Sequence, residues 1–517
     1  MAETVSTVET SSESKLPGGW SPKTGFGRWL DNYFGISSRG SSILKELIGG
    51  LVIFLAMFYI LPLNAAMLSS NWAGIAAGIP GVENVKVIGD VTYILLYGDT
   101  WATVAQVNAA VFAATAISAS VTTILMGLIG KLPIGLASGL GLNSLIAFNV
   151  LLGLGYNFAQ SMCVVLIDGI LFLIISITPL RAWIVRAIPK SLKIAISAGI
   201  GFFIAFIGLQ NTGIIVDGAT LVTLGSFKEL PTLMGLIGII IILAISALPE
   251  KNRTIFWIKK FGVIITIVIM GVICGAMGTA GVPGFAPYYD SSYHLSEIGN
   301  FGKIFGSVFR GFDCLAKPSS YALIFALLFT DFFDTTGTLV GVEQGAGMIN
   351  EDGTMTVSDR GAMVVDAIGT CFGAVCGTTT VTSFVESTTG VAAGARTGLA
   401  AVTTGGLFGL SLLIYPALSM FSTPCVTGLA LVYVGICMFS GLKDLDWKDW
   451  VSVGSTFLTV LFMTVSYSIS DGIAAGFLFY TVMTAVSGKF TKKDITVAAC
   501  TVAFVAIFVM KYLTGIF

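Results

Sequence analysis

The stretch YALIFALLFTDFFDTTGTLVG, residues 321–341, decides the fold class. It is long enough to cross the hydrocarbon core as a helix, which takes about 20 residues. Yet it carries two carboxyls, Asp331 and Asp334, near its middle. An ionised carboxyl at bilayer depth costs about 3 kcal/mol or more, and it persists where it is paired, protonated or facing a cavity. The stretch therefore predicts a membrane helix that lines a polar site.

The composition of the 517-residue chain also indicates a membrane protein. Hydrophobic residues make up 55% of the chain and charged residues 11%, whereas a soluble domain is about 25% charged. The mean hydropathy is +0.91, and the 62 glycines suit membrane helices that pack closely. The net charge of -1 gives no basis for a nucleic-acid partner. We therefore predict an integral protein of the cell membrane.

Apolar segments recur along the chain and predict an all-α polytopic fold with about 14 transmembrane helices. The candidate spans are residues 46–68, 101–130, 138–153, 157–179, 191–211, 231–248, 258–280, 319–342, 359–377, 386–395, 398–420, 425–442, 450–468, 470–489 and 494–516. Two of them, 138–153 and 386–395, are too short and too polar to cross alone. Basic residues gather at 15–45, 181–193 and 251–260, all on one side when the crossings are counted. That side, with the amino terminus, is predicted to be cytoplasmic.

The two halves of the chain carry matching interruptions. GLIGKLPIGLASGLGLN (127–143) and GAVCGTTTVTSFVESTTG (373–390) each leave an apolar helix, pass a short extended stretch and enter a small-residue segment. MFYILPLNAAM (57–67) and FTDFFDTTGTL (329–339) each place a helix break or a polar cluster in mid-span. An odd number of spans per half makes the halves inverted. Paired broken helices in inverted repeats predict a secondary transporter with its site near the midplane.

Polar residues inside these interrupted spans are the candidate site. Glu386 begins the short tenth segment, and Asp331 and Asp334, at i and i+3, share one face of the eighth. Carboxyls that face a cavity can bind a polar solute and exchange a proton. Asn143, in the matching segment of the first half, can donate and accept hydrogen bonds, and helix packing is an equal alternative for it. Asp366 is interpreted as a packing or helix-end residue.

Several function classes are excluded by what the chain lacks. It has one histidine, His294, in a polar segment, and eight scattered cysteines without a CxxC pair. This predicts no metal site, no cofactor and no enzyme active site. There is also no GxxxxGK[ST] motif, so no ATP-driven motor is expected in this chain.

Four motifs carry a resemblance to a known family. They are DFFDTTGTLVGV (331–342), TTTVTSFVESTTGVAAGARTGLAAV (378–402), GLASGLGLNSLIAF (135–148) and YSISDGIAAGFLFY (467–480). They resemble the AzgA-like adenine, guanine and hypoxanthine permeases of the nucleobase–cation symporter (nucleobase–ascorbate transporter) superfamily. The resemblance runs from about residue 45 to the end of the chain.

The resemblance implies two inverted seven-helix repeats, arranged as a core domain that moves past a gate domain. The expected boundaries are a cytosolic tail at 1–44, the two halves of the core at 45–180 and 319–420, the two halves of the gate at 181–281 and 421–517, and an outer loop at 282–318. The gate half at 421–517 includes the carboxyl-terminal segment. The short extended stretches of the third and tenth spans are expected to meet at the substrate.

The resemblance also implies roles for individual residues. The predicted substrate-binding residues are Glu386, Asp334, Asn143, Ser387, Thr388 and Phe384. Glu386 and Asp334 are also predicted to couple protons, with Asp331 as the alternative eighth-span carboxyl. The chain departs from the family pattern at Ser138, where a proline is expected, and at Ser144, where the pattern has an aromatic residue nearby. Which base is preferred therefore stays open.

The function expected from this resemblance is proton-coupled transport of adenine, guanine or hypoxanthine by alternating access. The expected partners are the purine, the proton and the lipid bilayer, and a homodimer stays open. The alternatives are a sulfate or bicarbonate transporter of the same fold, a uracil or xanthine carrier, a channel and a membrane enzyme. Three carboxyls argue against an anion, and no filter motif indicates a channel.

Overall fold

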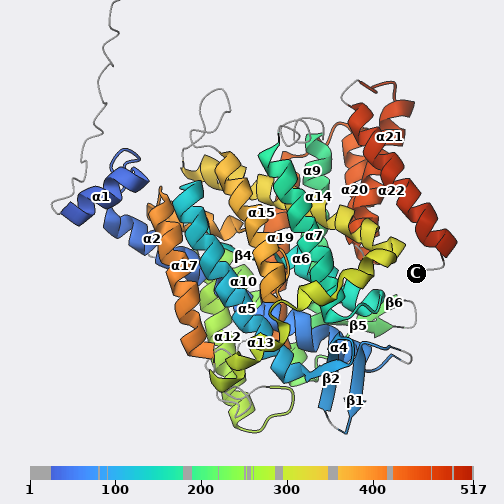
Figure 1. The fold of residues 1–517 in the computed structure, drawn as a ribbon, viewed down its shortest axis with the longest axis horizontal. Helices are drawn as coiled ribbons and strands as arrows, with labels where there is room; N and C mark the ends of the chain where they lie inside the picture. The colour runs from blue at the N-terminus through green and yellow to red at the C-terminus, as the bar shows by residue number, and fades with distance from the viewer. Residues whose placement is uncertain are drawn as a thin grey trace, which may run out of the picture.

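The protein is mostly helical, and its helices form a bundle with short β strands at the lower end in Figure 1. The computed structural model describes residues 25–79, 82–89, 91–178, 189–218, 221–249, 252, 255, 258–259, 261–285, 295–346, 359–415, 423–466, 469–491 and 494–514. Residues 1–24 of the predicted cytosolic tail, and His294, lie outside the described residues.

Helices lie in every predicted span. The longer ones are α1 (Gly25–Phe34), α2 (Ile43–Met57), α5 (Val104–Leu125), α7 (Phe158–Ile177), α9 (Lys190–Asn211), α10 (Leu230–Ser246), α12 (Gly262–Thr279), α14 (Pro318–Ala346), α15 (Asp359–Cys376), α17 (Gly398–Leu410), α19 (Pro424–Phe439), α20 (Trp450–Val465), α21 (Ile469–Val486) and α22 (Asp494–Thr514). The shorter ones are α3 (Ile60–Ala66), η1 (Met67–Asn71), α4 (Trp72–Ala76), η2 (Met126–Gly130), α6 (Leu140–Ser144), η3 (Leu145–Gly153), η4 (Leu295–Asn300), α13 (Phe301–Ile304), η5 (Ser307–Arg310), η6 (Phe312–Ala316), η7 (Val385–Ser387), α16 (Thr388–Ala393), η8 (Ser411–Ile414) and η10 (Ser440–Asp444).

Five helical runs among the described residues are long and apolar enough to cross a membrane. They are Ile43–Ala76, Val104–Gly130, Phe158–Ile177, Lys190–Asn211 and Pro424–Asp444. A sixth candidate is the pair Ser296–Ala316 and Pro318–Thr336, which bends by 116°. Further apolar helices are shorter: Leu140–Gly153, Leu230–Ser246, Ile265–Thr279, Gly398–Ile414, Trp450–Val465 and Asp471–Val486. The number of transmembrane helices, about 14, stays a prediction.

Two short sheets lie between helices, at residues 85–103 and 215–224, and the prediction of an all-α fold did not include them. Strands β1 (Val85–Ile88), β2 (Val91–Tyr97) and β3 (Thr100–Thr103) form an antiparallel sheet in that order, and β5 (Ile215–Gly218) pairs with β6 (Leu221–Leu224). The strands are rich in β-branched and aromatic residues, which favour a pleated backbone. Gly89 and Gly98, at positive φ, lie in the turns between the first three.

The helices pack closely where glycines meet. A Cβ at Gly398 in α17 would strike the backbone of Gly127 in η2, and one at Gly208 in α9 would lie 2.6 Å from the carbonyl oxygen of Gly428 in α19. The helices form two sets, and within each set the helices contact one another. One set is α2, α5, α7, α15, α16 and α17, and the other is α9, α10, α12, α19, α20 and α21. The long helix α14 contacts members of both sets.

Candidate functional site

The two extended stretches predicted in the third and tenth spans pair with each other. Strand β4 (Leu136–Ser138) lies antiparallel to β7 (Val381–Ser383), with Ala137 opposite Thr382. Backbone bonds continue the pairing on both sides, from the Phe384 N–H to the Gly135 oxygen at 3.0 Å and from the Gly139 N–H to the Thr380 oxygen at 3.0 Å. The two interrupted spans, far apart in the sequence, are thereby joined in the interior. This pairing satisfies backbone groups that lipid could not.

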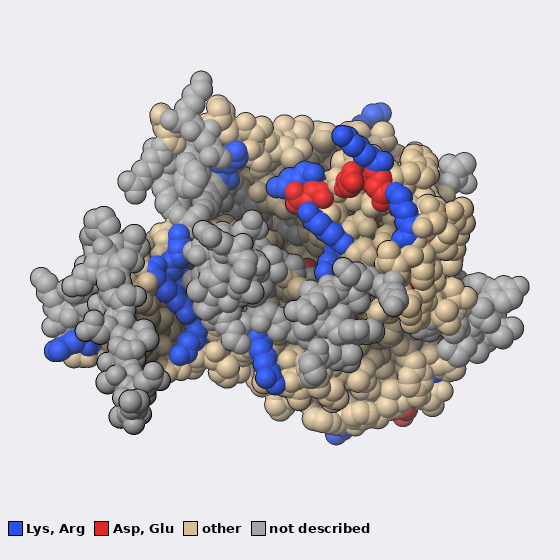
Figure 2. All heavy atoms as spheres, turned by 90° about the horizontal axis from the view of Figure 1, so that it is seen from above, with Lys and Arg blue, Asp and Glu red and all other residues tan. Residues whose placement is uncertain are grey.

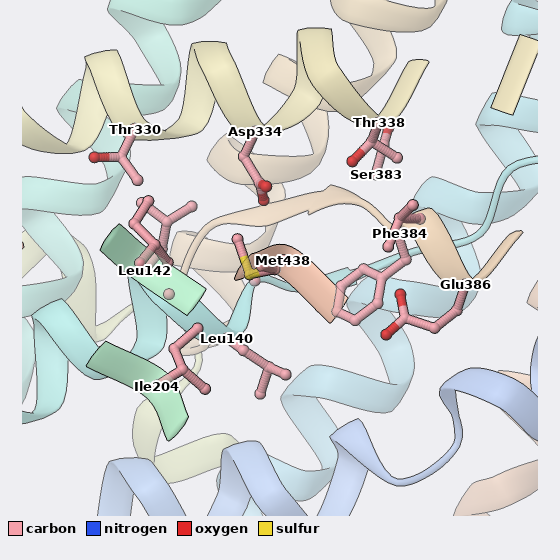
Figure 3. A pocket seen from close by; sticks show the side chains of 14 residues that line it. Leu140, Leu142, Ile204, Thr330, Asp334, Thr338, Ser383, Phe384, Glu386 and Met438 are labelled. Atoms are coloured by element: carbon pink, nitrogen blue, oxygen red, sulfur yellow. The ribbon is translucent and has the colours of Figure 1, made fainter. Parts of the chain in front are cut away.

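A cavity opens beside this strand pair, and we call it the central cavity. It measures about 540 Å³ including the part open to solvent. Its lining residues are Gly139, Leu140, Gly141, Leu142, Ile200, Ile204, Thr330, Asp334, Thr338, Ser383, Phe384, Val385, Glu386 and Met438. Figure 3 shows the carboxyls of Asp334 and Glu386 entering from different sides, with the ring of Phe384 beside Glu386. The cavity is thus largely apolar with two acidic groups.

Glu386 is held by a tyrosine from the first span. The Tyr59 hydroxyl donates a hydrogen bond of 2.9 Å to Glu386 Oε1. Tyr59 lies between α2 and α3, where Pro62 has no N–H to donate to the preceding turn. Tyr59 was not among the residues predicted for the site, although the proline in YILPLN indicates the helix break. A charge-assisted bond from a buried hydroxyl fixes the direction of the carboxyl.

Asp334 approaches the central cavity from α14. Thr330 and Thr338 line the same cavity, four residues before and after it, so all three lie on one helix face. Burial and two neighbouring carboxyls act on the Asp334 carboxyl, and no hydrogen bond to it is found within the described part of the chain. Its oxygens are therefore available to a solute in the cavity.

Asp366 supports the site from behind rather than lining it. Its carboxyl accepts hydrogen bonds from Thr335 of α14 at 2.7 Å and from Ser383 of β7 at 2.6 Å. Thr335 also lies 2.9 Å from the hydroxyl of Thr382. Asp366 thus joins α15, α14 and the strand that lines the cavity. Beyond the packing or helix-end role expected from the sequence, these contacts link Asp366 to the strand that lines the cavity.

Four predicted site residues do not line the central cavity. Asn143 is buried, and its Oδ1 accepts a hydrogen bond from Thr379. Ser387 accepts the Gly135 N–H at 3.0 Å, and Thr388 donates to the Val385 oxygen at 2.8 Å. The fourth, Asp331, is buried elsewhere and accepts a hydrogen bond from Thr370. Their predicted roles toward a substrate stay predictions.

The serine that replaces the expected proline has a structural role. Ser138 Oγ lies 2.8 Å from Thr378 Oγ1. The Asn64 amide donates to Thr378 and to Thr115, both at 2.7 Å. These contacts tie the first span to α5 and to the residues before β7. A proline at this position would lose the hydroxyl of this buried network.

Among the described residues, no group of three or more His, Cys, Asp or Glu could hold a metal ion.

A helical membrane bundle with a cavity at two joined broken spans defines a membrane transporter. The sequence pattern of the Permease family matches residues 87–475, and the chain belongs to this family. Its members are transporters, not enzymes. The membership agrees with the resemblance found from the motifs.

Named relatives and a solved structure extend this finding. The chain is 35% identical over 467 residues to the guanine/hypoxanthine permease PbuG of Bacillus subtilis, covering 89% of this chain and 95% of the relative. It is 31% identical to the adenine permease AdeQ of Escherichia coli, covering 93% and 96%. The transmembrane domain of the cyanobacterial bicarbonate transporter BicA has a similar fold, with a TM-score of 0.56 at 15% identity, covering 84% of this chain and 96% of that one.

Proposed function

We propose that the protein carries purine nucleobases across the membrane together with protons, by alternating access. The observation that carries this proposal is the central cavity, with Asp334 and Glu386 facing a space otherwise lined mainly by apolar side chains. The relatives named guanine/hypoxanthine and adenine permeases support the same substrate class.

The chemistry of the cavity suits a flat heterocycle. A purine has two apolar faces and an edge of N–H donors and ring-nitrogen acceptors. Phe384 and Met438 offer contact to the faces, and Glu386 can accept ring N–H groups at the edge. Asp334 lies on another wall and can accept a second N–H or exchange a proton. We assign the substrate contacts first to these two carboxyls and Phe384.

The position of the cavity supports a core domain that moves against a gate domain. One wall comes from α6, α14 and the β7–η7 segment, which belong to the predicted core. The other wall comes from Ile200 and Ile204 of α9 and Met438 of α19, which belong to the predicted gate. Movement of one set of helices past the other would expose the cavity to each side in turn. The two inverted seven-helix repeats remain part of this proposal.

The amino terminus is proposed to lie in the cytoplasm. Arg39, just before α2, donates hydrogen bonds to the carbonyl oxygens of Lys131 at 2.8 Å and Arg396 at 3.1 Å. Three basic residues from distant segments therefore meet at one end of the bundle. Figure 2, seen from above, shows Lys and Arg side chains spread over that view, and most of the visible Asp and Glu side chains lie in its upper part among further Lys and Arg side chains. A basic face is typical of the cytoplasmic side.

Charge disfavours the alternative of an anion transporter. Sulfate or bicarbonate would meet Asp334 and Glu386 in the cavity and be repelled by them. The likeness to the bicarbonate transporter concerns the fold only. A uracil or xanthine carrier needs the same kind of pocket and differs in the size and edge pattern of the base.

Uptake in cells that lack their own nucleobase carriers tests the proposal. Cells are supplied separately with radiolabelled adenine, guanine, hypoxanthine, xanthine or uracil, with and without a proton uncoupler. Uptake of labelled sulfate is measured in the same way to test the anion-transporter alternative. We expect saturable, uncoupler-sensitive uptake of at least one purine and no uptake of sulfate. Membrane-localised protein that takes up sulfate and no base would overturn the proposal.

A further inference from the structure

Two aspartates are buried outside the central cavity, and we call them the aspartate pair. Asp168 of α7 and Asp331 of α14 are both 0% exposed and close enough to interact electrostatically. Within the described part of the chain, neither carboxyl oxygen of Asp168 has a hydrogen-bond partner, and Asp331 Oδ1 has none. Burying a polar group without a hydrogen-bond partner is costly, and more so for a charged group. Packing alone gives no reason to keep two such groups together.

The surrounding helices enclose the aspartate pair. Next to Asp168, Gly169 packs so tightly on α15 that an added Cβ would lie 2.8 Å from Cys371 Sγ. One turn further along α7, Phe172 meets Phe332 of α14 edge to face, with ring centroids 6.0 Å apart. Helices α7, α14 and α15 contact one another (Figure 1). The pair therefore lies in an apolar position between three helices of the proposed core.

The charged groups that act on the pair are carboxyls. Asp366 of α15 and Asp334 of α14 interact electrostatically with Asp331, and Cys371 of α15 is a further titratable neighbour. Asp313 contacts α7 through Gln160, about 12 Å along the helix axis from the pair. Neighbouring carboxyls in an apolar site cannot all ionise, and they titrate as a unit. The pair must therefore hold at least one proton.

A threonine links the pair to the strand that lines the cavity. The Thr370 hydroxyl can donate to Asp331 Oδ2 at 3.1 Å or to the carbonyl oxygen of Val381 in β7 at 3.3 Å. Two residues further along β7, Ser383 lines the central cavity. A change in the charge of Asp331 and the binding of a solute therefore both act on the same short strand. Such shared contacts let two ligands favour one conformation.

We propose that the aspartate pair is a proton site of the transport cycle, separate from the carboxyls of the central cavity. The proposal rests on the proposed function. In the outward-facing state the pair takes one proton from the outer water, which forms an O–H bond on a carboxylate and neutralises the pair. The core then moves without a buried charge, which is the costly species at membrane depth. After the purine leaves, the O–H bond breaks and the proton passes to the inner water.

The number of protons moved per purine tests this proposal. Purified protein in liposomes is given opposing purine and pH gradients, and the condition of zero net flux gives the proton-to-purine ratio. We expect the double variant Asp168→Asn, Asp331→Asn to lower this ratio by one, because no carboxyl of the pair is left to bind the transported proton. Either single variant should keep the wild-type ratio, because the amide replaces the carboxyl that stays protonated and the other carboxyl still binds and releases one proton. Asp313→Asn is the matched control, since that carboxyl contacts the same helix outside the pair, and its ratio should equal that of the wild type.

The outcomes separate this proposal from the proposed function. Purine counterflow in the same liposomes shows whether each variant is folded, and Asp168→Ser with Asp331→Ser serves if the double asparagine variant is not. If the wild type moves protons with purine and a folded double variant keeps the wild-type ratio, the aspartate pair is only structural and this proposal is wrong. If the wild type moves no purine at all, the proposed function itself fails.

Discussion

Replacement of Tyr59 by phenylalanine removes the hydroxyl that holds Glu386 and leaves the ring in place. Tyr59 is 4% exposed, so the helix break around it should keep its packing. The lost bond, 2.9 Å long, ends on a carboxyl group. Hydrogen bonds to charged groups contribute about 1.5–3 kcal/mol. Water in the open cavity can replace part of the lost hydrogen bond, so we expect a loss of binding free energy at the low end of this range. Such a loss corresponds to a rise in the KM for purine of about tenfold.

The assay is initial-rate uptake of labelled purine over a range of concentrations, normalised to the amount of protein in the membrane. Tyr156→Phe is the matched control, because that hydroxyl also bonds to neighbours, Ser319 and Ser320 at 2.8 Å, but does not line the cavity. Its KM should stay within twofold of the wild type. An unchanged KM in Tyr59→Phe, or an equal rise in both variants, would refute the reasoning.

Three further changes have defined outcomes. Glu386→Gln keeps the shape of the side chain but removes its titratable group, so uptake should lose its sensitivity to an uncoupler; uptake that stays uncoupler-sensitive would exclude Glu386 from coupling. Gly398→Val should prevent the close packing of α17 on Gly127, and the amount of folded protein on gel filtration should fall by more than half. Gly406→Val is the control, because a Cβ there meets open space, and the amount of folded protein should not fall. Lys489, 2.7 Å from Asp449, lowers the pKa of this surface carboxyl. Asp449→Asn should therefore lower the free energy of unfolding at neutral pH by less than about 1 kcal/mol, which would appear as a slightly lower Tm. A lowered pKa stabilises the fold only while the group is ionised, so the two Tm values should converge below about pH 4; a gap that persists there would contradict the assignment.

The candidate residues that line the central cavity come from places where polarity interrupts an apolar span. Asp334 and Glu386 stand out because a carboxyl is costly in a membrane helix, and both line the central cavity. The extended stretches at 133–137 and 380–385 stand out because small and polar residues break a hydrophobic run. The structure pairs β4, which overlaps the end of the first stretch, with β7, which lies inside the second. Local composition was sufficient for these features.

The parts that could not be predicted depend on contacts between distant segments. Nothing near Tyr59 in the sequence shows that its partner is 327 residues away. Asp366 looked like a helix-end residue because its partners, Thr335 and Ser383, come from α14 and β7. Asn143 occupies the predicted segment but points its amide oxygen at Thr379. Periodicity gives the face of a helix, not the neighbour that it meets.

The most direct test of the account is accumulation of labelled purine by purified protein in liposomes under an imposed pH gradient. With an acidic exterior, we predict that purine rises inside above its external concentration, and that an uncoupler returns it to equality. Protein-dependent entry that only equilibrates, and is the same with and without the gradient, would contradict proton coupling at the carboxyls of this fold.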